Sequence, residues 1–208
     1  NPMIKKSYNE KKYSTRNPVK RYLLNMFYKK ILRVIYEINP KNILDVGCGE
    51  GYMSERIFKQ FPDSHITGID INSEAIKIAK SRCSDVRFQV EDIYAIPFDT
   101  NSFDLVICSE VLEHIKDPSI ALNEISRVSS KRVLLTVPHE PWFWLLNLLS
   151  LNHLYTFGNV PDHINHWTVK KFSNFICSKL NIVEVKTSLP WIIAHGENKK
   201  NTDDKYPK

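Results

Sequence analysis

The chain has 208 residues, of which 42% are apolar and 25% charged, a balance that is typical of a globular domain and excludes a wholly disordered chain. This length suffices for one domain with a buried core, or one domain with a small cap. The longest apolar stretch, 142–151, contains polar residues and is too short to span a bilayer. The charged N-terminus lacks the apolar segment of a secretory signal. We therefore expect no transmembrane segment.

Cysteine spacing indicates the redox compartment of the protein, and the distribution of charge indicates its possible partners. Cys48, Cys83, Cys108 and Cys177 are dispersed and form no C-x-x-C pair, which favours a reducing compartment, the cytoplasm, and argues against a disulfide framework. The net charge of +6 is uneven, because residues 1–42 carry eleven basic and two acidic side chains. Such an arm is typical of contact with nucleic acid, a membrane surface or an acidic substrate, or of a solvated amphipathic helix. We favour the helix and expect no nucleic-acid partner.

Apolar residues with helical spacing over 19–38 predict a first helix, which Pro40 ends. Strand-like and helical segments then alternate. The strands are expected at 43–46, 65–70, 86–90, 103–108 and 132–137, and the helices at 52–61, 73–83 with Ser73 as its cap, and 117–129. This alternation predicts an α/β fold with a doubly wound, mostly parallel sheet covered on both faces.

Beyond Pro138 the alternation stops. Residues 138–167 are rich in Pro, His, Trp and Asn and predict a small cap insertion with a short apolar helix near 142–151. A last helix at 168–180 precedes two strands, 182–188 and 190–195, which are joined through Pro190. The expected organisation is an N-terminal arm and helix that act as a cap over 1–42, an α/β domain over 43–196 that carries the insertion, and a polar tail over 197–208.

Three of the six glycines, Gly47, Gly49 and Gly51, directly follow the first strand and open a helix. Glycine permits a tight turn and lets a ligand approach the backbone, and a helix N-terminus adds free N–H groups. The spacing is G-x-G-x-G, which differs from the G-x-G-x-x-G turn that binds a dinucleotide pyrophosphate. The turn therefore favours a close ligand and argues against a nicotinamide dehydrogenase.

Acidic residues follow the next two strands. Asp70 ends the second strand, where its carboxylate can accept hydrogen bonds from both ribose hydroxyls of a nucleoside. Asp92 follows the third strand, where it can contact the exocyclic amine of adenine while Ile93 covers the ring. Either acid alone is equally consistent with a solvated side chain. Together with the glycine turn, they predict an adenosine-like ligand at the carboxyl edge of the sheet.

Four motifs in order resemble those of class I S-adenosylmethionine-dependent methyltransferases, type 11, the UbiE/UbiG-like group. They are Asp45-Val46-Gly47-Cys48-Gly49-Glu50-Gly51, Gly68-Ile69-Asp70, Glu91-Asp92 and the segment from Phe103 to His114. The resemblance covers residues 40–140. It implies a Rossmann-like fold with a seven-stranded sheet whose last strand is antiparallel, S-adenosylmethionine as cofactor and S-adenosylhomocysteine as product.

The resemblance also implies roles for individual residues. Gly47, Cys48 and Gly49 would pass beside the methionine part, and Asp45 would order the turn. Asp70 with Ile71 would hold the ribose, and Asp92 with Ile93 the adenine. Ser109 and Glu110 would line the site beneath the methyl group. Tyr13 and Arg16 would clamp the cofactor's carboxylate, or else are exposed residues of the arm.

The acceptor pocket is expected from segments 4–20 and 138–167. Methyl transfer is an in-line displacement that needs alignment, and a general base only when the acceptor is a poor nucleophile. We predict His139 and His163 as catalytic candidates, because a histidine titrates near neutrality; the alternative is that they bond to neighbouring backbone. His163, Trp167 and Thr168 match an H-x-x-x-(W/F)-(S/T) stretch of relatives of the group. No metal is expected, including at His163-x-x-His166.

The apolar segment 142–151 has two interpretations: contact with an apolar acceptor or a membrane surface, or a cap helix packed on the sheet, which we favour. The predicted function is methyl transfer to a small-molecule acceptor by a monomer or homodimer. The alternatives are a nucleic-acid methyltransferase and a non-catalytic, methyltransferase-like regulator. The fourth strand ends in Cys108-Ser109-Glu110, unlike the Asn/Asp-Pro-Pro-aromatic loop of enzymes that methylate a flipped adenine.

Overall fold

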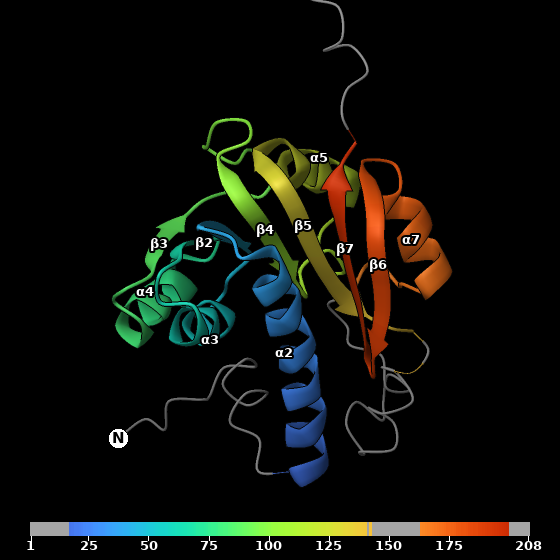
Figure 1. The fold of residues 1–208 in the computed structure, drawn as a ribbon, viewed down its shortest axis with the longest axis horizontal. Coiled ribbons are helices and arrows are strands. Elements are labelled where there is room, and N and C mark those ends of the chain that lie inside the picture. The colour runs from blue at the N-terminus through green and yellow to red at the C-terminus, as the bar shows by residue number, and fades with distance from the viewer. Residues whose placement is uncertain (1–16, 141, 143–162, 200–208) are drawn as a thin grey trace, which may run out of the picture.

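A computed structural model describes residues 17–140, Trp142 and residues 163–199 (Figure 1). Tyr13, Arg16, most of the predicted insertion at 138–167 and the tail from 200 lie outside the described residues. The fold is a seven-stranded sheet with helices on both faces.

The elements follow the predicted alternation. The strands are β1 (Asn42–Val46), β2 (His65–Asp70), β3 (Arg87–Val90), β4 (Phe103–Ser109), β5 (Ser129–Pro138), β6 (Leu180–Ser188) and β7 (Trp191–Asn198). The helices are α2 (Pro18–Ile38), α3 (Tyr52–Gln60), α4 (Ser73–Arg82), α5 (Pro118–Val128) and α7 (Val169–Ile176).

The strand order is β3-β2-β1-β4-β5-β7-β6. Strands β1 to β5 pair in parallel, and β7 pairs antiparallel with both β5 and β6. This confirms the predicted doubly wound sheet with an antiparallel last strand. The direction of winding reverses between β1 and β4, and ligands of open α/β sheets bind at such a switch point.

Strand residues alternate between two cores, one on each face of the sheet. In β4, Leu105 and Ile107 belong to the core that includes α2, α3 and α4, whereas Val106 and Cys108 belong to the core that includes α5 and α7. All four side chains are fully buried. The continuous apolar runs in the sequence therefore reflect a sheet that is covered on both sides.

Helix α2 is a structural layer of the fold, lying across the sheet (Figure 1). The Asn17 side chain caps its start by accepting bonds from the N–H groups of Val19 and Lys20. Phe27 is 1% exposed, and its ring centroid lies 4.6 Å from that of Trp191 on β7. The first predicted helix is thus confirmed, with its apolar face buried on the sheet.

Several local predictions differ from the structure, and one is the last helix, which is predicted to reach residue 180 but ends at Ile176. The Ser73 cap is wrong, because Asn72 caps α4 through bonds from the N–H groups of Glu74 and Ala75. Strand β5 begins three residues early, because α5 ends at Val128 with no intervening loop. Strand β7 extends to Asn198, whose side-chain amide donates to two backbone carbonyls near the end of α5.

Two further observations concern the surface and interior. Among the helices that the structure describes, none combines the length and apolarity needed to cross a bilayer. Cys48, Cys83 and Cys108 are buried, whereas Cys177 at the end of α7 is exposed.

Candidate cofactor-binding site

The carboxyl ends of the four neighbouring strands β3, β2, β1 and β4 bring most of the predicted site residues to one edge. In the register, Val46 of β1 lies beside Ile69 of β2 and Cys108 of β4, and Asp70 lies beside Val90 of β3. The segments that follow these strands therefore meet at the switch point of the sheet.

The glycine turn after β1 is held by β2. The N–H groups of Gly47 and Cys48 donate to the carbonyl of Ile69 at 2.8 and 2.9 Å, and Gly49 N–H donates to the Asp70 carboxylate at 2.8 Å. Gly47 has a φ of +70°, and a Cβ there would lie 2.3 Å from the Val111 side chain in the loop after β4. Glycine is thus required both by the backbone and by the close approach of that loop.

Asp70 organises this edge of the sheet. One carboxylate oxygen accepts from Gly49 N–H and the other from Asn72 N–H, each at 2.8 Å. The side chain is half-buried and links the glycine turn to the start of α4. Each oxygen of an ionised carboxylate has a second lone pair that can accept a further bond. Asp70 therefore has a structural role that the sequence did not predict. Its contact with a ribose stays a prediction.

The residues predicted to hold the ribose and adenine are accessible. Ile71 is 71% exposed, and Asp92 is exposed with one oxygen accepting from Tyr94 N–H at 2.9 Å. Ile93 is half-buried against the core on the α5 side. The exposed apolar side chain of Ile71, the half-buried Asp70 and the exposed Asp92 suit a nucleoside, which has an apolar ring face and polar edges.

Asp45 and Cys48 lie inside the fold. Asp45 is 2% exposed and accepts a hydrogen bond from the Ser54 hydroxyl of α3. Burial raises the pKa of Asp45 to about 6, although the Ser54 bond lowers it, and the charge of Asp70 adds to the rise. Burial likewise raises the pKa of the Cys48 thiol. This geometry supports the turn-ordering role of Asp45.

The tip of β4 is braced by β5 and β7. The hydroxyls of Ser109 and Thr136 lie 2.8 Å apart, and Glu110 N–H donates to the Thr136 carbonyl at 3.1 Å. Glu110 has a left-handed φ of 59°, and Trp191 Nε1 donates to its carboxylate at 2.7 Å. Such a conformation is strained for a residue other than glycine and persists where neighbours hold it. No signal in the sequence identified Trp191 or Thr136.

The histidine candidates lie at the same edge. His139 follows β5, and its Nδ1 is buried without a hydrogen-bond partner among the described residues. Burial lowers the pKa of His139. His163 is 9% exposed and packs edge-to-face on His114, with ring centroids 4.9 Å apart. His166 Nδ1 lies 3.7 Å from the Glu140 carboxylate.

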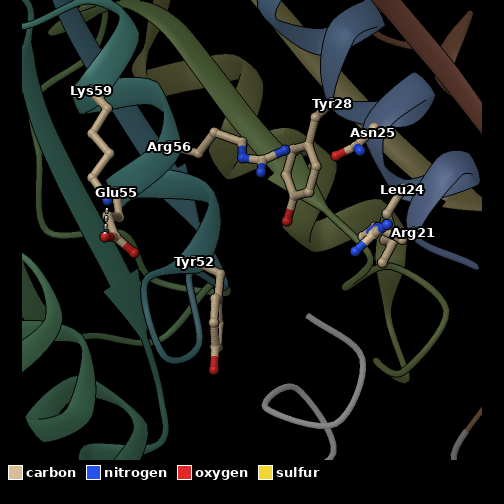
Figure 2. A pocket seen from close by; sticks show the side chains of 8 residues that line it. All are labelled: Arg21, Leu24, Asn25, Tyr28, Tyr52, Glu55, Arg56 and Lys59. Atoms are coloured by element: carbon tan, nitrogen blue, oxygen red, sulfur yellow. Dashed lines mark hydrogen bonds and ion pairs between the residues drawn. The ribbon is translucent and has the colours of Figure 1, made fainter. Parts of the chain in front are cut away.

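A pocket of about 340 Å³ opens between α2 and α3 (Figure 2). It is lined by Arg21, Leu24, Asn25, Tyr28, Tyr52, Glu55, Arg56 and Lys59. Tyr52 directly follows the glycine turn, and the Arg56 guanidinium lies 4.0 Å from the centroid of the Tyr28 ring. None of these lining residues belongs to the predicted cofactor set, so the pocket is lined by a different group of residues.

The strand order, the antiparallel β7 and the glycine turn at the switch point define a Rossmann-like, class I S-adenosylmethionine-dependent methyltransferase fold. The sequence model of the family described as "Methyltransferase domain" matches residues 39–185, and the chain belongs to this family. Its cofactor is S-adenosylmethionine.

Solved structures share the fold at low sequence identity. The PH0226 protein from Pyrococcus horikoshii OT3 superposes with a TM-score of 0.69 at 20% identity, over 91% of this chain and 96% of that one. The magnesium protoporphyrin IX methyltransferase of Synechocystis PCC 6803, solved with bound S-adenosylhomocysteine, gives a TM-score of 0.68 at 15% identity, over 94% and 89%.

Curated relatives match the central part of the chain. A ubiquinone biosynthesis O-methyltransferase of Coxiella burnetii (strain Dugway 5J108-111) is 33% identical over 101 residues, which are 47% of this chain and 42% of the relative. A demethylmenaquinone methyltransferase of Thermotoga maritima is 30% identical over 109 residues, 52% and 48% of the two chains. The match thus spans less than half of each of these relatives.

Proposed function

We propose that this protein transfers the methyl group of S-adenosylmethionine to a small-molecule acceptor by in-line displacement. The observation that carries the proposal is the convergence of the glycine turn, Asp70 and Asp92 at the switch point of a sheet that belongs to the methyltransferase-domain family. The bound cofactor supplies a methyl group on a positively charged sulfur, which an acceptor nucleophile can displace.

The residues present fit this cofactor. The backbone of Gly47 and Gly49 has no side chain to obstruct the methionine part, and both residues have positive φ values. The half-buried Asp70 can accept from a ribose hydroxyl while it still holds Gly49 N–H. The exposed Ile71 can cover one face of the nucleoside, and burying it would remove apolar surface from water.

The residues around the reacting groups act mainly by alignment and by exclusion of water. Ser109 and Glu110, braced by Thr136 and Trp191, form a rigid floor at the tip of β4. His139, whose pKa is lowered by burial, is neutral at pH 7, so its imidazole can accept a proton if the acceptor is a hydroxyl.

For the acceptor we propose a small aromatic compound of the quinone class. Two relatives at 30% identity or more are named for ubiquinone biosynthesis and for demethylmenaquinone. A radiolabelled-methyl assay with catechols and reduced quinones, against sugars and polynucleotides as alternatives, tests this class. Transfer to polynucleotides alone would contradict it.

Calorimetric titration with S-adenosylmethionine and S-adenosylhomocysteine tests the site itself. Asp70→Ala should weaken binding at least tenfold, which is about 1.4 kcal/mol, because the ribose loses its acceptor. Asp92→Ala should also weaken binding. The Asp92 carboxylate accepts one backbone hydrogen bond where that of Asp70 accepts two, so its loss should disturb the glycine turn less. Asp63→Ala, in the exposed turn before β2, is the matched control. Unchanged binding in both Asp70 and Asp92 variants, with intact thermal unfolding, would remove the site assignment.

A further inference from the structure

A cluster of one carboxylate and two imidazoles lies beside the loop after β4, apart from the glycine turn. Glu113, His114 and His163 each offer one ligand atom, and these atoms all lie within 4.8 Å of one another. We propose that the three side chains form a binding site for a divalent transition-metal ion such as Zn²⁺. This inference replaces the expectation from the sequence that the protein holds no metal.

The backbone brings the two halves of this cluster together. The carbonyl of Glu113 accepts bonds from the N–H groups of Ile164 and Asn165 at 2.7 and 3.0 Å. The Asn165 side chain then donates to the carbonyls of Leu112 and Ile115 at 2.9 and 2.7 Å. These four bonds fix the position of the His163 segment against the turn that carries Glu113. A metal site requires such preorganisation, because its ligands must be held in place before the ion arrives.

Burial and ligand chemistry favour a transition metal. Glu113 is 1% exposed and His163 is 9% exposed, so both ligand groups are shielded from water, where attraction between a carboxylate and a cation is stronger. Imidazole nitrogens suit zinc and its neighbours in the first transition row, whereas magnesium and calcium prefer oxygen ligands alone.

The ligand atoms of the three side chains need to move only slightly to bind a zinc ion. Zinc bonds of about 2.0–2.2 Å place tetrahedral ligand atoms about 3.3–3.6 Å apart. His114 Nε2 already lies 3.9 Å from a Glu113 oxygen, and its side chain is 40% exposed and therefore able to rotate. Three protein ligands leave the fourth position of a tetrahedral ion open for an oxygen ligand.

The site lies at the edge where the cofactor is expected. Glu113 is three residues after Glu110, which lines the floor at the tip of β4. An ion with an open position there could hold an acceptor oxygen and lower the pKa of an acceptor hydroxyl. This last role rests on the proposed function, whereas the metal site does not, and metal binding can be measured without turnover.

The test uses the full chain after treatment with a chelator. Calorimetric titration with ZnCl₂ should show one ion bound per chain, and titration with CoCl₂ should give the visible absorption of a tetrahedral cobalt site. Glu113→Gln and His163→Ala should each weaken Zn²⁺ binding at least tenfold. His114→Ala should do the same, and because the His114 side chain is 40% exposed and lies outside the core, this variant keeps the test decisive if a buried variant unfolds.

His166→Ala is the matched control, since it removes a histidine that is three residues from His163 and lies outside the proposed ligand set, with its Nδ1 3.7 Å from the Glu140 carboxylate. Its Zn²⁺ binding should equal that of the unmodified protein. The proposal is overturned if the unmodified protein binds no Zn²⁺, or if the three ligand variants bind it as tightly as the control. In that case the cluster is a packed Glu–His–His group only. If Zn²⁺ binds as proposed while methyl transfer is absent, the metal site stands and the proposed function fails.

Discussion

The charge of Asp45 opposes folding at neutral pH. Its pKa rises from an ordinary 3.8 to about 6 in the folded protein, so the folded state binds a proton more tightly than the unfolded chain does. Below pH 4 both states are protonated and the effect vanishes. Above pH 6 the buried carboxylate is ionised and the folded state carries the full penalty, about 3 kcal/mol for a shift of this size.

Asp45→Asn should therefore become progressively more stable, relative to the unmodified protein, as the pH rises from 4 to 6. The asparagine keeps an oxygen that can accept the Ser54 bond and removes the repulsion from Asp70. Urea unfolding at pH 4, 5, 6 and 8 measures the difference in free energy of unfolding. If the difference in free energy of unfolding stayed constant over this pH range, it would contradict the raised pKa of Asp45.

Asp104→Asn should have the opposite effect on stability at neutral pH. Burial tends to raise the pKa of Asp104, but bonds from Lys131 and from the N–H groups of Asn42 and Lys41 outweigh it and hold the pKa below its ordinary value. Its contribution to stability is present at neutral pH and is lost as the pH falls through the folded pKa. The asparagine variant should thus be less stable at pH 7 and converge with the unmodified protein in acid.

At this scale the glycine turn and the strand-end acids could be predicted, because three glycines directly follow the first strand and an acid ends or follows each of the next two. It did not predict that Asp70 accepts Gly49 N–H, since that bond depends on the left-handed conformation of the turn. Nor did it predict the bond from Trp191 to Glu110, which joins residues from β7 and the tip of β4.

Among the elements, the start of α4 allows a direct comparison of two adjacent residues. Asn72→Ala should cost about 1 kcal/mol of stability, because its side-chain oxygen satisfies two N–H groups that have no partner within the helix. Ser73→Ala, one residue later in the exposed first turn, should change stability by less than about 0.5 kcal/mol. Chemical denaturation of both variants tests the assignment of the cap, and equal losses would contradict it.

Element type and order could be predicted because central strands such as β4 contain apolar runs, and because α2 has a regular apolar stripe. Element ends were harder to place. Strand β5 begins with residues such as Ser130 and Lys131, which are exposed and carry no apolar signal. The docking of segment 163–165 on the turn at 112–115 relies on backbone carbonyls, which every residue has, so no pattern in the sequence could reveal it.

For the molecule as a whole, α2 is expected to be essential to stability. Phe27→Ala should destabilise the protein by about 3–5 kcal/mol, because it leaves a cavity between α2 and Trp191 of β7. Tyr36→Ala, on the same helix but 76% exposed, should be nearly neutral. Thermal unfolding of the two variants measures the difference. A small effect of Phe27→Ala would mean that α2 is a detachable appendage.

The distribution of the four cysteines gives the folded chain a built-in reporter. Cys177 lies at the surface, whereas Cys48, Cys83 and Cys108 are enclosed by the two cores. A thiol-specific dye should therefore modify one sulfur rapidly in the native protein and the other three only as the sheet opens. Labelling at Cys177 would place a single probe beside α7 without any substitution, and the rate of the slow phase would report how often the interior becomes accessible.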